Sequence, residues 1–179
     1  MATPTTLPAT FTAGQVLTAA QMNNLRGAFR VLQVVQSVQS ATQTITNTAY
    51  TDVTGMSVSI TPSATSSKVL VVVDAKLAPS LAAAFLTMQV VRASTAIYLG
   101  DAAGTRIQAT YGTVGSSVDI MHAGVAYFLD SPATTSATTY KIQVRSSSGS
   151  VYLNRTGTDT DSTSYFRTSS SITVMEISA

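Results

Sequence analysis

The spacing of apolar residues divides the chain into a short first part with helical spacing and a long second part with the alternation of β-strands. In the first part, apolar residues recur every three or four positions and would share one face of a helix. They are Met22, Leu25, Phe29 and Leu32. Thr18 and Gln21 have the spacing of a capping box, so we expect the helix to begin at Thr18. The prolines Pro4 and Pro8 favour an extended arm before it.

From about Val31 onward, the pattern is that of strands. The clearest alternation lies in residues 56–60, where Met, Val and Ile alternate with Ser before Pro62 ends the pairing. The run Val-Leu-Val-Val-Val at residues 69–73 predicts a strand over 68–77 that is buried on both faces. The full set of expected strands is 31–45, 56–60, 68–77, 86–90, 97–99, 118–129, 140–144, 151–153 and 172–177.

This set of strands, separated by turns rich in Ser, Pro and Gly, predicts a mainly β fold. We expect an antiparallel, jelly-roll-like β-sandwich preceded by an extended N-terminal arm and one short helix. Residues 1–30 would form the arm and helix, and residues 31–179 the sandwich. A helix of about 13 residues is marginal alone in water. Its apolar face therefore needs a cover, either its own domain or a neighbouring protein.

Composition changes the picture of the surface. Of the 179 residues, 45% are hydrophobic and only 10% charged, against about 25% charged in an average soluble protein. Ser and Thr make up 52 residues, and Thr sits comfortably on the outer face of a strand. We expect a surface hydrated by hydroxyl groups, with contacts that depend only weakly on ionic strength.

The titratable residues exclude several kinds of site. The chain has no Cys and one His, His122, so it offers no disulfide, no thiolate zinc site and no cluster of histidine ligands. Glu176 is the only Glu. The best local carboxylate pair, Asp159 and Asp161, resembles a calcium loop but lacks its glycine and closing glutamate. We expect no metal, no cofactor and no catalytic residue.

Two short motifs could indicate catalysis or modification. A Ser-His-Asp triad would depend on His122, but Asp119 precedes it by three positions, which in a strand places the two side chains on opposite faces. Residues 154–156, Asn-Arg-Thr, match a glycosylation acceptor, although three-residue matches occur by chance. The basic residues are dispersed, so we expect no nucleic-acid partner. No apolar run approaches the roughly 20 residues that span a bilayer, so we expect no membrane insertion.

Three stretches resemble bacteriophage virion appendage proteins. Residues 10–23, TFTAGQVLTAAQMN, are similar to the openings of phage tail and fibre proteins. Residues 51–62, TDVTGMSVSITP, and 170–177, SSITVMEI, resemble the body of small fibre-like phage proteins. The resemblance implies that the N-terminal part attaches to the particle and the sandwich projects outward, commonly as a homotrimer. It supplies no catalytic residues.

We therefore expect a non-enzymatic virion structural protein, assembled in the host cytoplasm. The first hypothesis is a trimeric, tail-associated fibre or tip protein that contacts the host surface and binds other virion proteins. The alternative is a capsid decoration or head-fibre protein. The residues expected to attach it to the virion are Phe11, Val16, Leu17, Met22, Leu25 and Phe29. The residues expected to recognise the host surface, including a glycan, are Asp159, Asp161, Tyr165 and Arg167.

Two further classes stay open. One is a surface depolymerase that would use Asp159 and Asp161 as a carboxylate pair. The other is a carbohydrate-binding module without catalysis, which would need exposed aromatic rings as stacking platforms. The tyrosines considered for that role are Tyr98, Tyr111 and Tyr152.

Overall fold

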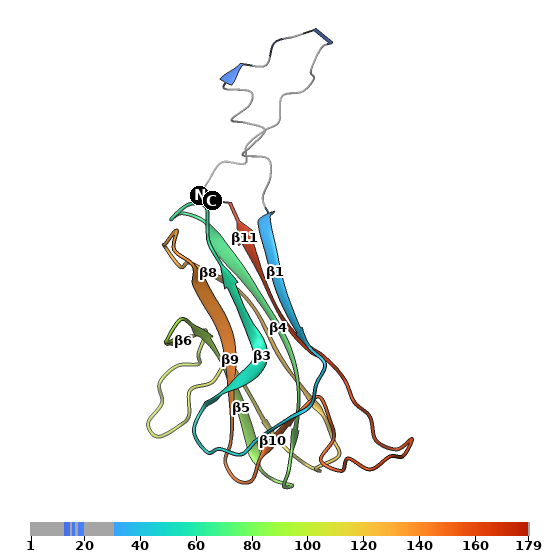
Figure 1. Ribbon diagram of the computed structural model, residues 1–179. Coiled ribbons are helices and arrows are strands. Elements are labelled where there is room, and N and C mark those ends of the chain that lie inside the picture. The colour runs from blue at the N-terminus through green and yellow to red at the C-terminus, as the bar shows by residue number, and fades with distance from the viewer. Residues whose placement is uncertain (1–12, 15, 17, 20–30, 179) are drawn as a thin grey trace.

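The computed structural model describes residues 13, 14, 16, 18, 19 and 31–178. The arm and the helix expected in residues 1–30 fall almost entirely outside these residues and stay predictions. The described chain forms a series of strands, most of which are labelled in Figure 1. They are β1 (Val31–Gln39), β2 (Gln43–Ile45), β3 (Thr51–Ile60), β4 (Lys68–Pro79), β5 (Phe85–Arg92), β6 (Thr95–Ile97), β7 (Tyr111–Val114), β8 (His122–Asp130), β9 (Thr138–Ser146), β10 (Val151–Leu153) and β11 (Ser170–Ile177).

The strands form two antiparallel sheets. In the first sheet, β4 lies between β8 on one side and β11 and β10 on the other, and β1 and β2 complete that side. In the second sheet, the order is β3, β9, β5, with both β6 and β7 beside β5. Because β2 and β10 continue β1 and β11 end to end, each sheet consists of four rows of strand. The connections between rows cross from one sheet to the other, except from β5 to the row of β6 and β7, which is jelly-roll topology.

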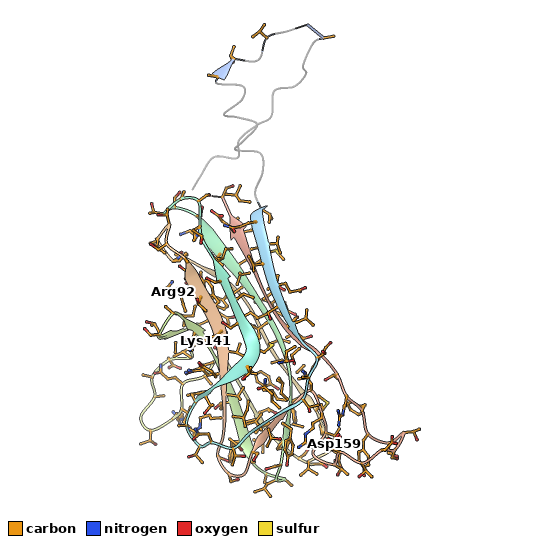
Figure 2. The ribbon with its side chains drawn as sticks, in the orientation of Figure 1. Arg92, Lys141 and Asp159 are labelled. Carbon is orange, nitrogen blue, oxygen red and sulfur yellow. The ribbon has the colours of Figure 1, made fainter. Side chains whose placement is uncertain are left out.

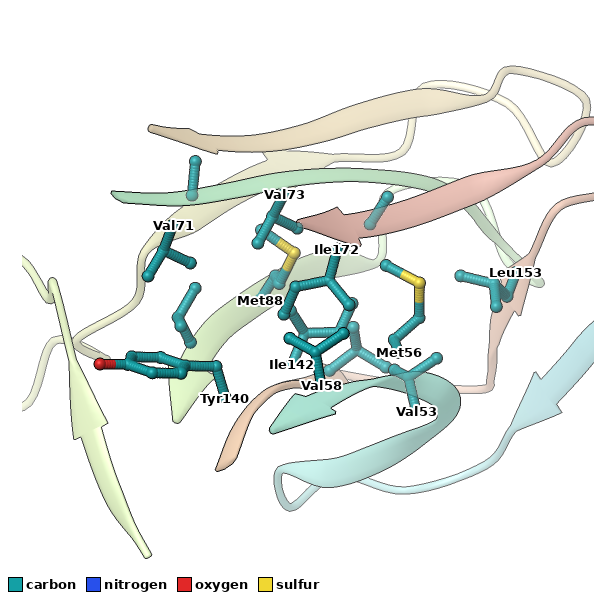
Figure 3. Close-up of a cluster of buried hydrophobic side chains, with 14 of the residues drawn as sticks. Val53, Met56, Val58, Val71, Val73, Met88, Tyr140, Ile142, Leu153 and Ile172 are labelled. Carbon is teal, nitrogen blue, oxygen red and sulfur yellow. The ribbon is translucent and has the colours of Figure 1, made fainter. Parts of the chain in front are cut away.

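The core lies between the two sheets and is made by alternate residues of the strands (Figure 3). Met56, Val58 and Ile60 of β3 are buried while Ser57 and Ser59 between them are exposed, as the alternation predicted. The second sheet adds inner residues of β5 and β9, and the first adds those of β4, β10 and β11. The prediction of a mainly β antiparallel sandwich is confirmed.

Strand β4 differs from its prediction. Its inner residues Val69, Val71 and Val73 are fully buried, but Leu70 and Val72 on the outer face are only half-buried. The prediction that this strand is buried on both faces is wrong, because no described element covers this part of the outer face. An apolar run identifies a strand but does not say whether its second face is covered.

Several other boundaries differ, and β3 already begins at Thr51. The single strand expected at 31–45 is split into β1 and β2, and the strand expected from residue 118 begins only at His122. The short strand expected at 97–99 ends at Ile97, since Tyr98 has a left-handed φ of 54°. Strand β7 was not predicted, because its four residues include a glycine and bury little side-chain surface.

A bulge in β3 joins the two sheets at one edge. The pairing of β3 with β9 shifts register between Asp52 and Ser57. The carbonyl oxygen of Thr54 in this bulge accepts hydrogen bonds from the Nε2 atoms of Gln39 (2.9 Å) and Gln43 (2.7 Å). These bonds fix the gap between β1 and β2, which lies beside the candidate site.

Candidate surface-recognition site

Residues 154–169 form a loop inserted into a single row of strand. Leu153 of β10 lies opposite Leu77 of β4, and Ser171 of β11 lies opposite Asp74. The chain therefore leaves the row after β10 and returns almost at the same level of the sheet. Arg155 and Arg167 form an isolated antiparallel bridge at the base of this excursion. We call residues 154–169 the recognition loop.

Asn154 anchors the recognition loop to the sheet. Its side chain is fully buried, and its backbone has a left-handed φ of 60°, which Asn tolerates better than most residues. Its Nδ2 donates to the carbonyl oxygens of Gln39 (2.7 Å) and Ala41 (3.1 Å). Its Oδ1 accepts from Ser170 Oγ (2.6 Å), which in turn accepts from the amide of Lys76 (2.9 Å). One side chain thus supplies hydrogen-bond partners where two adjacent rows of strand are interrupted, between β1 and β2 and between β10 and β11. The same side chain is too buried to serve as a glycosylation acceptor in the folded chain.

The recognition loop lies across the outer surface of the first sheet. On one side, Arg155 Nη2 donates to Thr44 Oγ1 of β2 (3.4 Å). On the other side, the amide of Gly157 donates to the carbonyl of Val118 (2.7 Å), and the amide of Thr158 donates to Asp119 Oδ1 (2.9 Å). Thr44 and Asp119 flank opposite edges of the sheet, so the loop bridges it.

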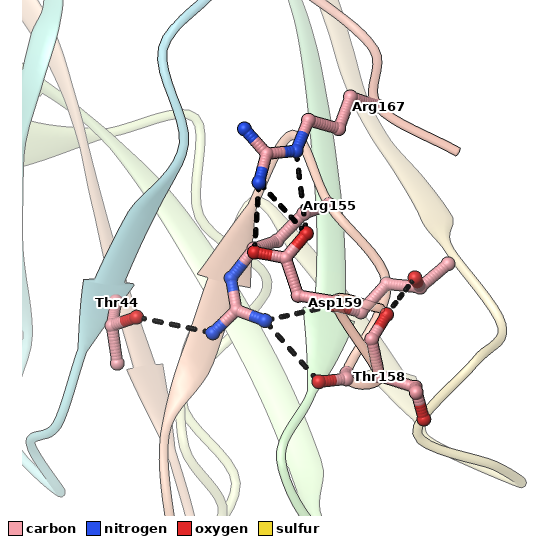
Figure 4. A network of polar contacts seen from close by, with 7 residues as sticks. Thr44, Arg155, Thr158, Asp159 and Arg167 are labelled. Carbon is pink, nitrogen blue, oxygen red and sulfur yellow. Dashed lines mark hydrogen bonds and ion pairs between the residues drawn. The ribbon is translucent and has the colours of Figure 1, made fainter. Parts of the chain in front are cut away.

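Arg155 stabilises the conformation of the recognition loop. Its guanidinium lies 3.6 Å from the centre of the Tyr152 ring, within cation–π range. Its Nη1 donates to the carbonyl oxygens of Thr156 (3.1 Å) and Gly157 (3.2 Å). Figure 4 shows this guanidinium reaching toward Thr44 beneath the Asp159 and Arg167 pair.

The outer part of the loop brings all four predicted recognition residues together. Arg167 Nη2 donates to both carboxylate oxygens of Asp159, at 2.9 Å each (Figure 4). These residues, with Asp161 and Tyr165, line an open pocket of about 350 Å³. Thr160, Ser162 and Phe166 complete its lining.

Phe166 is the residue that the sequence analysis missed. The residue is 53% exposed, although its side chain has no atom that can hydrogen-bond to water. The signal was available, since Phe166 lies between Tyr165 and Arg167 in a stretch otherwise rich in Ser and Thr. An aromatic ring, carboxylates and a guanidinium around one hollow can contact a ligand that carries hydroxyl groups.

The ion pair in the pocket is a weak constraint. The side chains of Arg167 and Asp159 are 63% and 38% exposed, and exposed ion pairs typically contribute between about 0 and 1 kcal/mol. A ligand hydroxyl can therefore exchange for either member of the pair at small cost. The pocket can rearrange its hydrogen bonds around a ligand without unfolding the loop.

Other predicted positions have different outcomes. Of the attachment residues, Val16 is 86% exposed, and Phe11, Leu17, Met22, Leu25 and Phe29 lie outside the described residues. Among the tyrosines considered as stacking platforms, Tyr98 stacks on Phe128 at 4.4 Å, and Tyr111 packs against the core. Tyr152 is half-buried and lies under the Arg155 guanidinium.

His122 and Asp119 make no pair, although not for the predicted reason. Asp119 lies in the turn before β8 and holds the recognition loop, whereas His122 is the first residue of β8. His122 Nδ1 lies 3.2 Å from Thr113 Oγ1, and its Nε2 is buried without a hydrogen-bond partner among the described residues. Because Asp119 and His122 do not lie in one strand, the alternation of side chains along a strand does not decide their relative orientation.

Two buried polar clusters lie at the opposite end of the sandwich from the recognition loop, where β1 begins. Arg92 Nη1 and the Tyr140 hydroxyl both donate to Asp130, at 2.8 and 2.6 Å. Burial and the hydrogen bond to Asp130 raise the pKa of Tyr140. In Figure 2, Arg92 lies on the left side of the sandwich and Asp159 lies lower, on the right side. This cluster joins β5, β8 and β9 and is structural.

Glu176 makes the second cluster. Its side chain is 1% exposed and faces the core side of β11. Its Oε1 accepts from the amide and hydroxyl of Ser63, both at 2.7 Å, and its Oε2 accepts from Gln33 Nε2 at 2.6 Å. Burial would raise the pKa of Glu176, but the hydrogen bonds from Ser63, Gln33 and Ser67 outweigh it and lower the pKa to about 2. The carboxylate ties the β3–β4 turn to β1 and β11.

In the residues that the structure describes, no three His, Asp or Glu side chains gather as a metal-binding group. Nor does any helix there have the length and apolar character required to cross a membrane.

No protein-family model and no curated protein sequence matches this chain. Among solved structures, the chain is similar to one described as the structure of infectious bursal disease virus Gt strain, with a TM-score of 0.44 and 12% identity. The match covers 81% of this chain and 42% of the other, so this chain spans less than half the length of its neighbour. A likeness of this degree carries no argument about function.

Proposed function

We propose that this protein is a non-enzymatic structural protein of a bacteriophage virion, a tail-associated fibre or tip protein. In this proposal, residues 1–30 attach it to the particle and the recognition loop contacts the host surface. Support comes from the resemblance of residues 10–23, 51–62 and 170–177 to phage appendage proteins and from the sandwich that begins at Val31.

The observation that carries the proposal is that the chain enters the sandwich at one end and presents the recognition loop toward the other end. Strand β1 begins at Val31, which pairs with Ile177 at one end of the first sheet. The recognition loop leaves the sheet beside Gln39 and Ala41, toward the other end of the same row (Figure 1). The chain therefore enters the sandwich at one end and presents its pocket toward the other. An appendage needs this separation, because the particle and the host surface lie on opposite sides of it.

The chemistry of the pocket favours a glycan as the host ligand. Asp159 and Asp161 offer acceptors, Arg167 offers donors, and Tyr165 and Phe166 offer ring faces. Since the pocket carries carboxylates and one guanidinium, a neutral polyhydroxyl ligand fits it without leaving a buried charge. A capsid decoration protein, the alternative role, has no need of such a pocket.

Binding to the host surface tests this proposal. We expect the fluorescently labelled full-length chain to bind host cells and their extracted surface polysaccharide, and Asp159→Asn with Arg167→Gln to reduce binding at least tenfold. The matched control is Asp52→Asn, which removes another exposed ion pair, with Lys141, on the second sheet. Equal binding by all variants would contradict a role for the pocket. Location of the chain on the head by antibody labelling of particles would favour the decoration role.

A further inference from the structure

The outer face of the first sheet is apolar at the end away from the recognition loop, where no described element covers it. Its exposed side chains include Tyr127 (62%), Val34 (56%) and Leu129 (55%). An antiparallel sheet with one face in water normally alternates apolar inside with polar outside. We call the following residues the apolar outer face: Leu32, Val34, Leu70, Val72, Val125, Tyr127, Leu129, Met175 and Ile177.

The strand register makes this face continuous. Val34 of β1 pairs with Met175 of β11, Met175 pairs with Leu70 of β4, and Leu70 pairs with Leu129 of β8. This gives one apolar row across all four strands of the sheet. Val72 and Tyr127 pair in the next row and extend the patch along the strands.

The patch is large enough to be the centre of an interface. Four strands at about 4.8 Å spacing and six residues at about 3.4 Å each give a footprint of about 400 Å². The footprint includes the polar residues Gln36 and Thr173, which hydrogen-bond to each other at 2.8 Å. Apolar patches of a few hundred Å² on soluble proteins often mark contact sites. A standard interface buries about 800 Å² on each partner. The patch would thus supply about half of one, with a rim around it.

The charges along β4 indicate which partner fits. The outward residues of its first half are, in order, Lys68, Leu70, Val72 and Asp74. If a second copy packs face to face with its β4 antiparallel, Lys68 lies over Asp74 of the second copy and Leu70 lies over its Val72. If the two β4 strands run parallel instead, Lys68 lies over Lys68. The first arrangement is self-complementary in charge and in apolar contacts, and a two-fold axis across the strands generates it.

The remaining polar groups on this face do not oppose burial. Asp74 already forms an ion pair with Lys76, and Lys68 Nζ donates to Ser131 Oγ at 2.8 Å. In the antiparallel contact Lys68 also faces Asp74 of the second copy, so its charge is not left without a counter-charge. Face-to-face sheets commonly pack about 10 Å apart with their strands within about 30° of each other.

We propose that the apolar outer face binds the same face of a second copy of this chain, in a two-fold contact with antiparallel β4 strands. This inference does not depend on the proposed function. It differs from the homotrimer that the phage resemblance implies, because a two-fold contact joins chains in pairs. Trimers could form only through another surface, giving an assembly of six chains.

The mass of the full-length chain in solution tests the proposal. Sedimentation at 1 to 100 µM is expected to give two chains or six, and Tyr127→Lys with Leu129→Lys to weaken association at least tenfold. The matched control, Ser57→Lys with Ser59→Lys, places the same charges on the exposed face of β3 and should leave the mass unchanged. Circular dichroism checks that each variant is folded. A mass of one or three chains, or a pair that survives the two lysines on β8, would overturn the proposal.

A charge exchange tests the orientation. Lys68→Glu and Asp74→Lys should each weaken association several-fold, and the double variant should recover most of the loss, because the opposite charges again face each other. If the double variant is no better than either single one, the antiparallel arrangement is wrong. If Leu25→Glu with Phe29→Glu alone abolishes association, the N-terminal segment and not the sheet face is the contact, which would also overturn the proposal.

Discussion

The two outer faces of the sandwich are built from the same kind of alternating strand but carry opposite chemistry. On the second sheet, the outward residues of β3 and β9 are mostly Ser, Thr, Lys and Gln. Asp52 there accepts from Lys141 Nζ and Gln143 Nε2, both at 2.7 Å, and these bonds lower its pKa. On the first sheet, the outward residues of β8 include Val125, Tyr127 and Leu129, and β4 and β11 add Leu70, Val72, Met175 and Ile177 beside polar residues.

This contrast shows that inward packing does not explain the outward residues. Both sheets bury their inner residues in one core, so the core alone would be satisfied by any polar outer face. The second sheet has such a face over β3 and β9, and its exposed apolar pair, Phe85 and Val114, lies at one end of β5 and β7. The first sheet has an outer face that remains costly in water, which is why we assign it a contact with a second copy.

The largest change in stability is expected when the same substitution is made on the inner and then on the outer side of β4. Val71→Asp places an unpaired carboxylate in the core and should destabilise the fold by about 4 kcal/mol or more. Val72→Asp, one residue further on the outer face, should leave the fold intact and weaken association. Thermal denaturation and sedimentation of both variants measure this difference. Equal unfolding by both would mean that the outer face is part of the folding core.

Glu176 is the charged exception on the inner side. Its pKa of about 2 in the fold, against 4.5 as the ordinary value, corresponds to about 3 kcal/mol of stability at neutral pH. Because the folded-state pKa is the lower one, this stability is present above about pH 4.5 and is lost as the pH falls toward 2. Urea denaturation from pH 7 to 2 should follow this course, and Glu176→Gln should flatten it. An unchanged slope in that variant would contradict the role of the cluster.

Asn154→Ala should have a smaller and local effect. The substitution leaves the carbonyls of Gln39 and Ala41 and the hydroxyl of Ser170 without their partner, which typically costs about 1 to 3 kcal/mol. Hydrogen exchange should rise in the recognition loop and in residues 40–42 but not in β3 or β9. Uniform loss of protection over the whole chain would mean that Asn154 supports the global fold.

The smallest expected effect lies on the polar face. Asp52 is 54% exposed, so removing its ion pair in Asp52→Asn should change stability by less than about 1 kcal/mol. The change should shrink further in 0.5 M salt. A loss of several kcal/mol would show that this face is more than a solvated surface.

Alternation predicted the inner faces well because burial on one side acts on every second residue. Residues 56–60 demonstrate this. The predicted recognition residues Asp159, Asp161, Tyr165 and Arg167 line one pocket, and their role stays a prediction. The outward face of β4 could not be predicted, since an apolar run has the same spacing whether its second face is covered or bare. The role of Asn154 also could not be predicted from the sequence. It depends on Gln39, Ala41 and Ser170, which lie beside Asn154 only because distant strands pair.

The most direct test of the unequal outer faces is a distance measurement between copies. The chain has no Cys, so a spin label on Val72→Cys or Ser59→Cys reports one position only. The account predicts a label-to-label distance below about 20 Å at position 72 and about 30 Å or more at position 59, since two sandwiches with sheets about 10 Å apart separate the second pair. No coupling at position 72, or a short distance at position 59, would contradict it.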